Sequence, residues 1–128
     1  MSWEHEIEVR VRYHETDGQG IVHHANYLHY FELARTEMLR VRGQDYELLE
    51  RQGHLLVVIE MSCRYHAPAR FGDLLNVRAT TAEVTKARIR HVYRVTCGEK
   101  LVATGQSMIA CVDRNGRIRR IPLDLSTD

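Results

Sequence analysis

The sequence contains few cysteines and prolines and no long apolar run. Its three cysteines are far apart and form no CxxC pair: Cys63, Cys97 and Cys111. That spacing argues against a disulfide framework and against a zinc ribbon. The first ten residues lack the apolar segment of a signal peptide, and no later run approaches the roughly 18 apolar residues of a membrane-spanning helix. We therefore expect a cytoplasmic protein without a transmembrane segment.

An excess of one sign of charge is also missing. Lys and Arg number 18, and Asp and Glu number 17. The composition therefore gives no net field that would favour nucleic acid or a membrane surface as a partner. The 128 residues contain no repeat, low-complexity run or linker. We expect one globular domain over residues 1–128, long enough to bury roughly two-thirds of the surface of its unfolded chain.

Periodicity predicts a strand followed by two helices. Residues 6–13 alternate, with four apolar or aromatic side chains on one face: Ile7, Val9, Val11 and Tyr13. This is the pattern of a strand with one wet face. Five residues then recur at helical spacing: Tyr27, Phe31, Ala34, Met38 and Val41. We expect Asn26 to cap this helix, Gly43 to lie just past its end, and a second, short helix within 45–53.

The rest of the chain reads as sheet. Four long runs are rich in β-branched residues: 55–66, 74–85, 87–97 and 101–113. Short connections between them favour antiparallel pairing, because parallel crossovers need a dozen or more residues. The order predicts an α+β fold in which one sheet packs a long helix on one face. One sheet and one helix leave further surface to bury, so we expect at least a dimer, most simply with C2 symmetry.

The segment around Asp17 allows several interpretations. Asp-Gly is a common turn pair, because Asp bonds to nearby backbone and Gly accepts a positive φ, so Asp17 can simply close a turn. A glycine-rich turn before a helix also leaves free N–H groups at the helix N-terminus, which suit a developing oxyanion. A carboxylate seven residues before that terminus could stand beside a carbonyl held there. That arrangement is suited to acyl transfer.

A metal site is the third interpretation of this segment. His23, His24 and His29 are close together, but their spacings are one, five and six residues. Zinc-binding helices place histidines at i and i+4 so that both rings point to one side. We therefore expect no metal and no other cofactor.

The stretch ETDGQGIVHHANYLHYFELAR resembles the active-site segment of the 4-hydroxybenzoyl-CoA thioesterase family of hot-dog proteins, which includes acyl-CoA thioesterases encoded beside the bacterial Tol–Pal system. The match lies in Thr16, Asp17, Gly20, Ile21, Val22, His24, Asn26, Tyr27, Glu32 and Ala34. A second stretch, CRYHAPARFGDLLNV, is similar to a later segment of the family, and the order of the elements agrees over nearly the whole chain.

The resemblance implies a hot-dog fold, with an antiparallel sheet wrapped around one long central helix, assembled as a homodimer or homotetramer. It implies hydrolysis of an acyl-CoA thioester. Asp17 would be the nucleophile or general base, and the His24 backbone N–H would bind the thioester carbonyl. A side-chain role for His24 stays open. The candidate substrate-binding residues are Tyr13, Gly20, Ile21, Val22, Asn26, Tyr27 and Glu32, several of which could equally be structural.

The phosphates of CoA need cations. Arg70 and the group Lys86, Arg88 and Arg90 are candidates, although a solvated strand face would explain each of them as well. Two other functions remain open. His24 and Glu32 could imitate the His–acid pair of hot-dog hydratases and dehydratases, or the chain could bind an acyl thioester without catalysis. The complete Asp17 motif favours the hydrolase.

Overall fold

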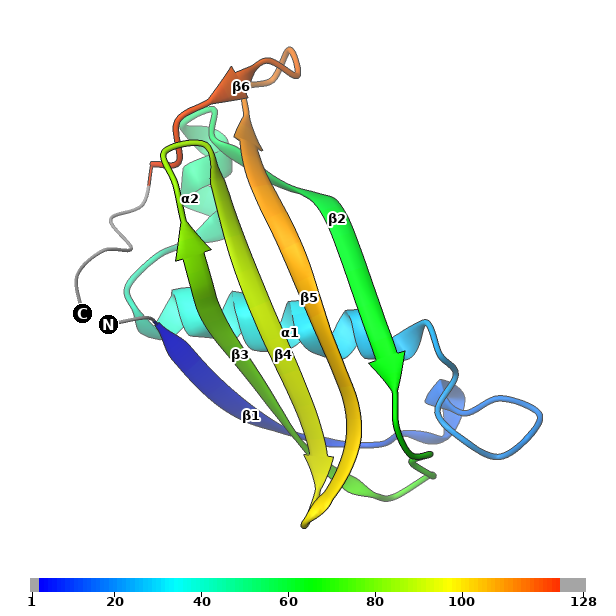
Figure 1. Ribbon diagram of the computed structural model, residues 1–128. Coiled ribbons are helices and arrows are strands. Elements are labelled where there is room, and N and C mark those ends of the chain that lie inside the picture. Colours follow the sequence, from blue (N-terminus) through cyan, green and yellow to red (C-terminus); the bar gives the residue numbers. More distant parts are fainter. Residues whose placement is uncertain (1–2, 123–128) are drawn as a thin grey trace.

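The computed structural model describes residues 3–122, in which an antiparallel sheet curves around one long helix (Figure 1). The elements are β1 (Glu4–Arg10), a 3-10 turn (Tyr13–Glu15), α1 (Asn26–Val41), α2 (Tyr46–Arg51), β2 (Leu55–Tyr65), β3 (Leu74–Val84), β4 (Arg88–Cys97), β5 (Lys100–Val112) and β6 (Ile118–Arg119). The strand order is β1-β3-β4-β5-β2, with β6 pairing β5. The α+β prediction is confirmed. The sequence analysis missed only the two-residue β6 among the strands.

The long helix packs one face against the sheet, as its spacing predicted. Tyr27, Phe31, Ala34 and Met38 are buried. Val41, predicted on the same stripe, is 51% exposed, and Leu39 is buried in its place. Val41 is the last helical residue before the chain reverses at Gly43, which has the expected positive φ. The predicted Asn26 cap is wrong, because Ala25 is the N-cap residue and no side chain caps it.

The first strand is shorter than predicted. Val9 and Val11 face the core, but β1 ends at Arg10, and Tyr13 lies in the 3-10 turn with 76% of its surface exposed. The cause is a later residue. The Glu15 carboxylate accepts hydrogen bonds from the backbone N–H of Arg12 at 2.8 Å and from its guanidinium at 2.7 Å. These bonds turn the chain before the alternation can continue.

The second helix is short and is capped at its start by a side chain. Asp45 caps α2 by accepting from the N–H groups of Glu47 and Leu48, and the chain leaves the helix through Gly53 with a positive φ. Both features fit the prediction of a short helix within 45–53. Among residues 3–122, no helix is long and apolar enough to cross a bilayer.

A polar row lies under α1 in the middle of the sheet. Arg35, only 5% exposed, donates to the Tyr93 hydroxyl at 3.0 Å, and that hydroxyl is 2.6 Å from Oγ of Ser107. His91, 3% exposed, pairs across strands with Ser107 on one side and Thr81 on the other. Burial, and after it the nearby Arg35 cation, lowers the pKa of His91 to about 3. The imidazole is therefore neutral in the folded protein at neutral pH.

This burial predicts acid sensitivity. The unfolded chain binds a proton at His91 near its usual pKa of about 6.5, whereas the folded protein does not. The contribution of neutral His91 to the free energy of unfolding is therefore fully present above about pH 6.5 and is lost as the pH falls toward 3. At pH 5 the loss from this group is about 2 kcal/mol. Urea unfolding of the wild type at pH 7 and pH 5 measures the loss. The difference should shrink in His91→Gln and persist in His14→Gln, a change at an exposed histidine. Equal pH dependence in wild type and His91→Gln would contradict the prediction.

Candidate active site

Asp17 begins a tight hairpin between the 3-10 turn and α1. Its backbone N–H donates to the Ile21 carbonyl at 2.8 Å, and Gly20 N–H donates to the Asp17 carbonyl at 3.0 Å. Gly20 has φ of +79°, a conformation that residues with a Cβ rarely adopt. One residue outward, Thr16 bridges to Val22. The glycine-rich sequence thus folds back at once and leads directly into the helix.

The Asp17 side chain closes this turn with one of its two oxygens. Oδ1 accepts from Gln19 N–H at 2.8 Å and lies 3.5 Å from Ile21 N. Within residues 3–122, Oδ2 has no hydrogen-bond partner. The structural interpretation of Asp17 is therefore correct for one oxygen, and the other is left available for chemistry.

The same turn occurs a second time in the chain, at Asp113. Asp113 Oδ1 accepts from Asn115 N–H at 2.8 Å and from Arg117 N–H at 3.0 Å, and Asp113 N–H donates to the Arg117 carbonyl at 2.8 Å. Gly116 has φ of +80°. The turn alone therefore does not mark a functional site. What distinguishes Asp17 is its surroundings.

Those surroundings are a cavity of about 500 Å³ between the hairpin, the start of α1 and the end of β2. Its lining consists of Asp17, Gln19, Ile21, Val22, His24, Tyr27, Tyr65, His66, Ala67 and Pro68. The rings of Tyr27 and Tyr65 meet edge to face at 5.6 Å. Burial is the largest of the influences that raise the pKa of Tyr27 to about 12, so its phenol stays protonated. The lining is thus mostly apolar and includes the carboxylate residue Asp17.

The backbone at the helix start has a free donor at His24, a residue that lines the same cavity. His23 N–H donates to the Glu15 carbonyl at 2.9 Å, and Ala25 N–H donates to Nδ1 of His23 at 3.1 Å. Between them, His24 N–H finds no acceptor within residues 3–122. An unused N–H at a helix N-terminus is a suitable donor for a carbonyl oxygen that gains negative charge.

Tyr65 is a cavity residue that the sequence analysis missed. Its hydroxyl donates to the His24 carbonyl at 3.0 Å and so ties the end of β2 to the start of α1. Burial is the largest cause that raises the pKa of Tyr65, and the neighbouring Cys63 raises it further. The hydroxyl therefore keeps its proton and stays a donor. The only sequence signal for Tyr65 is its place in the stretch CRYHAPARFGDLLNV. Nothing local indicates that residues 65–68 meet residues 17–27.

Of the nine residues predicted to form the catalytic and substrate sites, the structure brings five to this cavity: Asp17, Ile21, Val22, His24 and Tyr27. Gly20 shapes the hairpin. Asn26 donates from its side chain to the Glu15 carbonyl at 2.8 Å. Tyr13 packs on Phe71, outside the cavity. The Glu32 carboxylate is 66% exposed and 3.8 Å from the Arg35 guanidinium, away from His24.

The predicted phosphate-binding cations separate into two places. Arg70 pairs with Ile21 through a backbone bridge, so it lies beside the hairpin. Lys86, Arg88 and Arg90 lie at the opposite end of the sheet. Along β5, Tyr65 pairs with Ala103, whereas Arg90 and Arg88 pair with Met108 and Ala110, roughly 17 to 24 Å further at about 3.4 Å per residue. Within one protomer, antiparallel register keeps these three away from Asp17.

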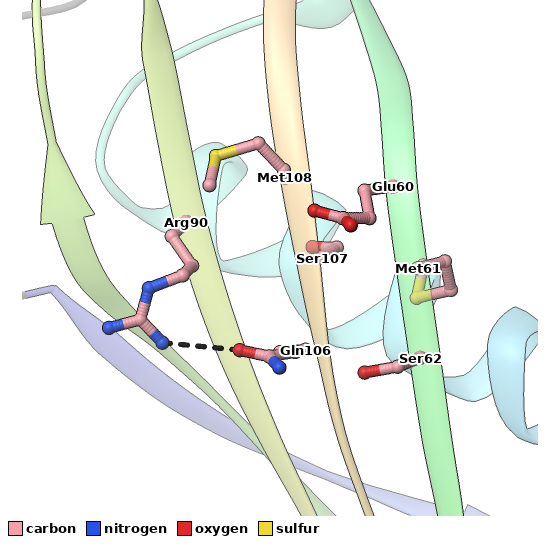
Figure 2. A pocket seen from close by; sticks show the side chains of 7 residues that line it. All are labelled: Glu60, Met61, Ser62, Arg90, Gln106, Ser107 and Met108. Atoms are coloured by element: carbon pink, nitrogen blue, oxygen red, sulfur yellow. Dashed lines mark hydrogen bonds between the residues drawn. The ribbon is translucent and has the colours of Figure 1, made fainter.

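Arg90 belongs instead to a second, smaller cavity of about 190 Å³ over β2, β4 and β5, shown in Figure 2. Its guanidinium donates to Gln106 at 3.3 Å and to Glu83 at 3.0 Å, so part of its donor capacity is already used. No group of three His, Cys, Asp or Glu side chains in the described part of the chain is arranged to hold a metal. His23 and His24 stack their rings at 4.2 Å instead.

The antiparallel sheet wrapped around α1 is the hot-dog fold of the thioesterase class of proteins. A hypothetical protein from Thermus thermophilus superposes with a TM-score of 0.88 at 36% identity, covering 94% of this chain and 93% of the other. A 1,4-dihydroxy-2-naphthoyl-CoA thioesterase from Synechocystis has the same fold, with a TM-score of 0.88 at 23% identity and coverage of 93% and 90%.

The family follows from the sequence comparison. Residues 11–127 match the thioesterase-like superfamily, and the chain belongs to it. The acyl-CoA thioesterase YbgC of Haemophilus influenzae is 40% identical over 106 residues, which are 82% of this chain and 78% of the relative. The acyl-CoA thioester hydrolase YbgC of Escherichia coli O6:H1 is 34% identical over 106 residues, with coverage of 82% and 79%.

Proposed function

We propose that this protein is an acyl-CoA thioesterase that hydrolyses an acyl-CoA to the free acid and CoA. One observation carries the proposal: Asp17, which has an unused carboxylate oxygen, and His24, which has an unused N–H, line the same cavity. The two YbgC relatives are named for the same reaction.

In the proposed reaction, His24 N–H donates to the thioester oxygen and stabilises the negative charge that develops there. Ionised Asp17 either takes a proton from water as the water adds to the carbonyl carbon, or attacks that carbon itself to give an anhydride that water then cleaves. In both routes the C–S bond breaks and CoA leaves as a thiolate. A thiol with a pKa near 8.5 needs little acid assistance to leave, so no Ser-His-Asp triad is required.

The remaining predicted residues receive roles of different kinds. Ile21, Val22 and Tyr27 form the apolar wall for the acyl thioester, while Gly20 and Asn26 shape the hairpin and the helix start. Arg70 would bind a CoA phosphate, because its backbone bridge to Ile21 sets it beside the hairpin. Contact of Lys86, Arg88 and Arg90 with the substrate would require a neighbouring protomer. Tyr13 and Glu32 stay predicted substrate-binding residues. A cytoplasmic location also stays a prediction.

We also propose that the protein assembles through β2, as a dimer or a tetramer. β2 is an edge of the sheet, and its side chains Val58 and Ile59 are 46% and 48% exposed. An unpaired edge that carries apolar side chains favours pairing with a second copy. Sedimentation at micromolar concentration should show a dimer or tetramer for the wild type and dissociation for Val58→Lys. A wild-type monomer would contradict the proposal.

A thiol-release assay with short-chain, long-chain and aromatic acyl-CoAs tests the function. The expected result is release of CoA from at least one class. The hydratase alternative is disfavoured within one protomer, because His24 lines the cavity and Glu32 faces solvent beside Arg35. Hydration of an enoyl-CoA without thiol release would support that alternative. Saturable acyl-CoA binding with no turnover of any substrate would support the non-catalytic module.

A further inference from the structure

We infer that Glu15 is a positioning residue that holds Asp17 and the His24 N–H at a fixed separation. The inference rests on the proposed function and deepens it. Glu15 does not line the cavity, so it does not touch the substrate there. It lies two residues before Asp17, at the point where the 3-10 turn, the hairpin and α1 meet.

The Glu15 side chain is fixed in the interior. Only 5% of the residue is exposed. Oε1 accepts from Arg12 N–H at 2.8 Å and from the Tyr30 hydroxyl at 3.0 Å. Oε2 accepts from the Arg12 guanidinium, through Nη2 at 2.7 Å and Nε at 3.2 Å. The carboxylate thus joins the segment after β1 to the second turn of α1.

The Glu15 backbone holds the other arm of the hairpin. Its carbonyl accepts from His23 N–H at 2.9 Å and from the Asn26 side chain at 2.8 Å. This bond fixes His23, the residue immediately before His24, which carries the proposed oxyanion donor. One residue therefore sets the position of the acid along one arm and of the free N–H along the other.

The negative charge of Glu15 contributes to this positioning. Burial raises its pKa, but the hydrogen bonds from Arg12 and Tyr30 outweigh burial, and the pKa of the folded state is lowered. The carboxylate is therefore ionised, and a neutral amide cannot replace it. In Glu15→Gln the side chain keeps its volume, but one carboxylate oxygen becomes an NH2 group. In one orientation of the amide this NH2 group faces the Arg12 guanidinium, and in the other it faces the Arg12 N–H and the Tyr30 hydroxyl. Both orientations bring hydrogen-bond donors together.

The kinetic test compares Glu15→Gln with Glu37→Gln. Glu37 is a matched control, because it also pairs with an arginine three residues away, Arg40, but at the far end of α1. Glu15→Gln should lower kcat about tenfold to a hundredfold with KM changed less than threefold, since a displacement of about 1 Å can cost that much. Glu15→Asp, which keeps the charge, should recover part of the rate, and Glu37→Gln should match the wild type.

A second readout does not depend on activity. Hydrogen exchange of the His23 amide, followed by NMR, reports its bond to the Glu15 carbonyl. Exchange should accelerate about tenfold or more in Glu15→Gln and stay unchanged in Glu37→Gln. Should Glu15→Gln fail to fold, Tyr30→Phe carries the same test, because it removes one of the four side-chain bonds and keeps the ring.

The outcomes separate this inference from the proposed function. A lower melting temperature in Glu15→Gln with unchanged kcat and unchanged His23 exchange would show a merely stabilising residue and overturn the inference, while the hydrolase would stand. Absence of thiol release by the wild type would reject the function, and the His23 exchange rates would still decide whether Glu15 positions the hairpin.

Discussion

Replacing Asp17 with Asn is expected to lower kcat/KM for thioester hydrolysis by about a hundredfold or more, or roughly 3 kcal/mol of transition-state stabilisation. The variant suits the structure because Asn retains the oxygen that accepts from Gln19 N–H. The hairpin should therefore persist. What is lost is the second oxygen, now an NH2 group that can neither accept a proton from water nor attack a carbonyl carbon.

The matched control is Asp113→Asn. Asp113 makes the same turn contacts as Asp17, with the N–H groups two and four residues further on, but it does not line the Asp17 cavity. Its substitution should leave kcat/KM within about twofold of the wild type. A thiol-release assay on all three proteins, with the folded state checked by circular dichroism, measures the difference. Full turnover by Asp17→Asn would remove Asp17 from the mechanism.

The second large effect concerns stability and is expected at Gly105. This glycine lies in β5 where Phe31 of α1 approaches the sheet. A Cβ at this position would lie 2.5 Å from the Phe31 ring and 2.7 Å from the Ser62 carbonyl oxygen. Phe31 is fully buried and stacked on Tyr93 at 4.5 Å, and the carbonyl belongs to the neighbouring strand, so neither can move aside easily. Gly105→Ala should destabilise the protein by about 3 kcal/mol, or about 10 °C in Tm.

Gly18→Ala is the control for this prediction. Gly18 has no atom within 4 Å of an added Cβ and does not have a positive φ. Its replacement should change the free energy of unfolding by less than about 0.5 kcal/mol. Chemical denaturation of the wild type and both variants gives the comparison. Equal stability of Gly105→Ala and Gly18→Ala would show that α1 does not pack against β5 as closely as the structure has it.

The elements with strong local patterns were predicted correctly. The spacing of Tyr27, Phe31 and Ala34 indicated the buried face of α1, and the long β-branched runs indicated β2 to β5. The errors fall at the ends of elements. Tyr13, Asn26 and Val41 each lie where a contact from elsewhere in the chain or a change of chain direction outweighs local periodicity.

The candidate site divides in the same way. Its hairpin is local, so Asp17 and Gly20 could be located from a short stretch of sequence. Its opposite wall is not. Tyr65 and Pro68 reach the cavity because β2 belongs to the sheet against which α1 packs, and their separation along the chain hides that contact. Arg90 was predicted to bind phosphate near Asp17 because the sequence does not reveal the strand register. That register places Arg90 at the other end of the sheet.

By itself the sequence determined the hairpin at Asp17, the helix that follows it and the four long strands, because turn chemistry and hydrophobic periodicity act over a few residues. The tertiary structure alone decided that the acid has a cavity beside it, that Glu15 ties the hairpin to α1, and that His91 and Arg35 are buried together. These are contacts between distant segments. They exist only once the sheet closes on the helix and water is removed from between them.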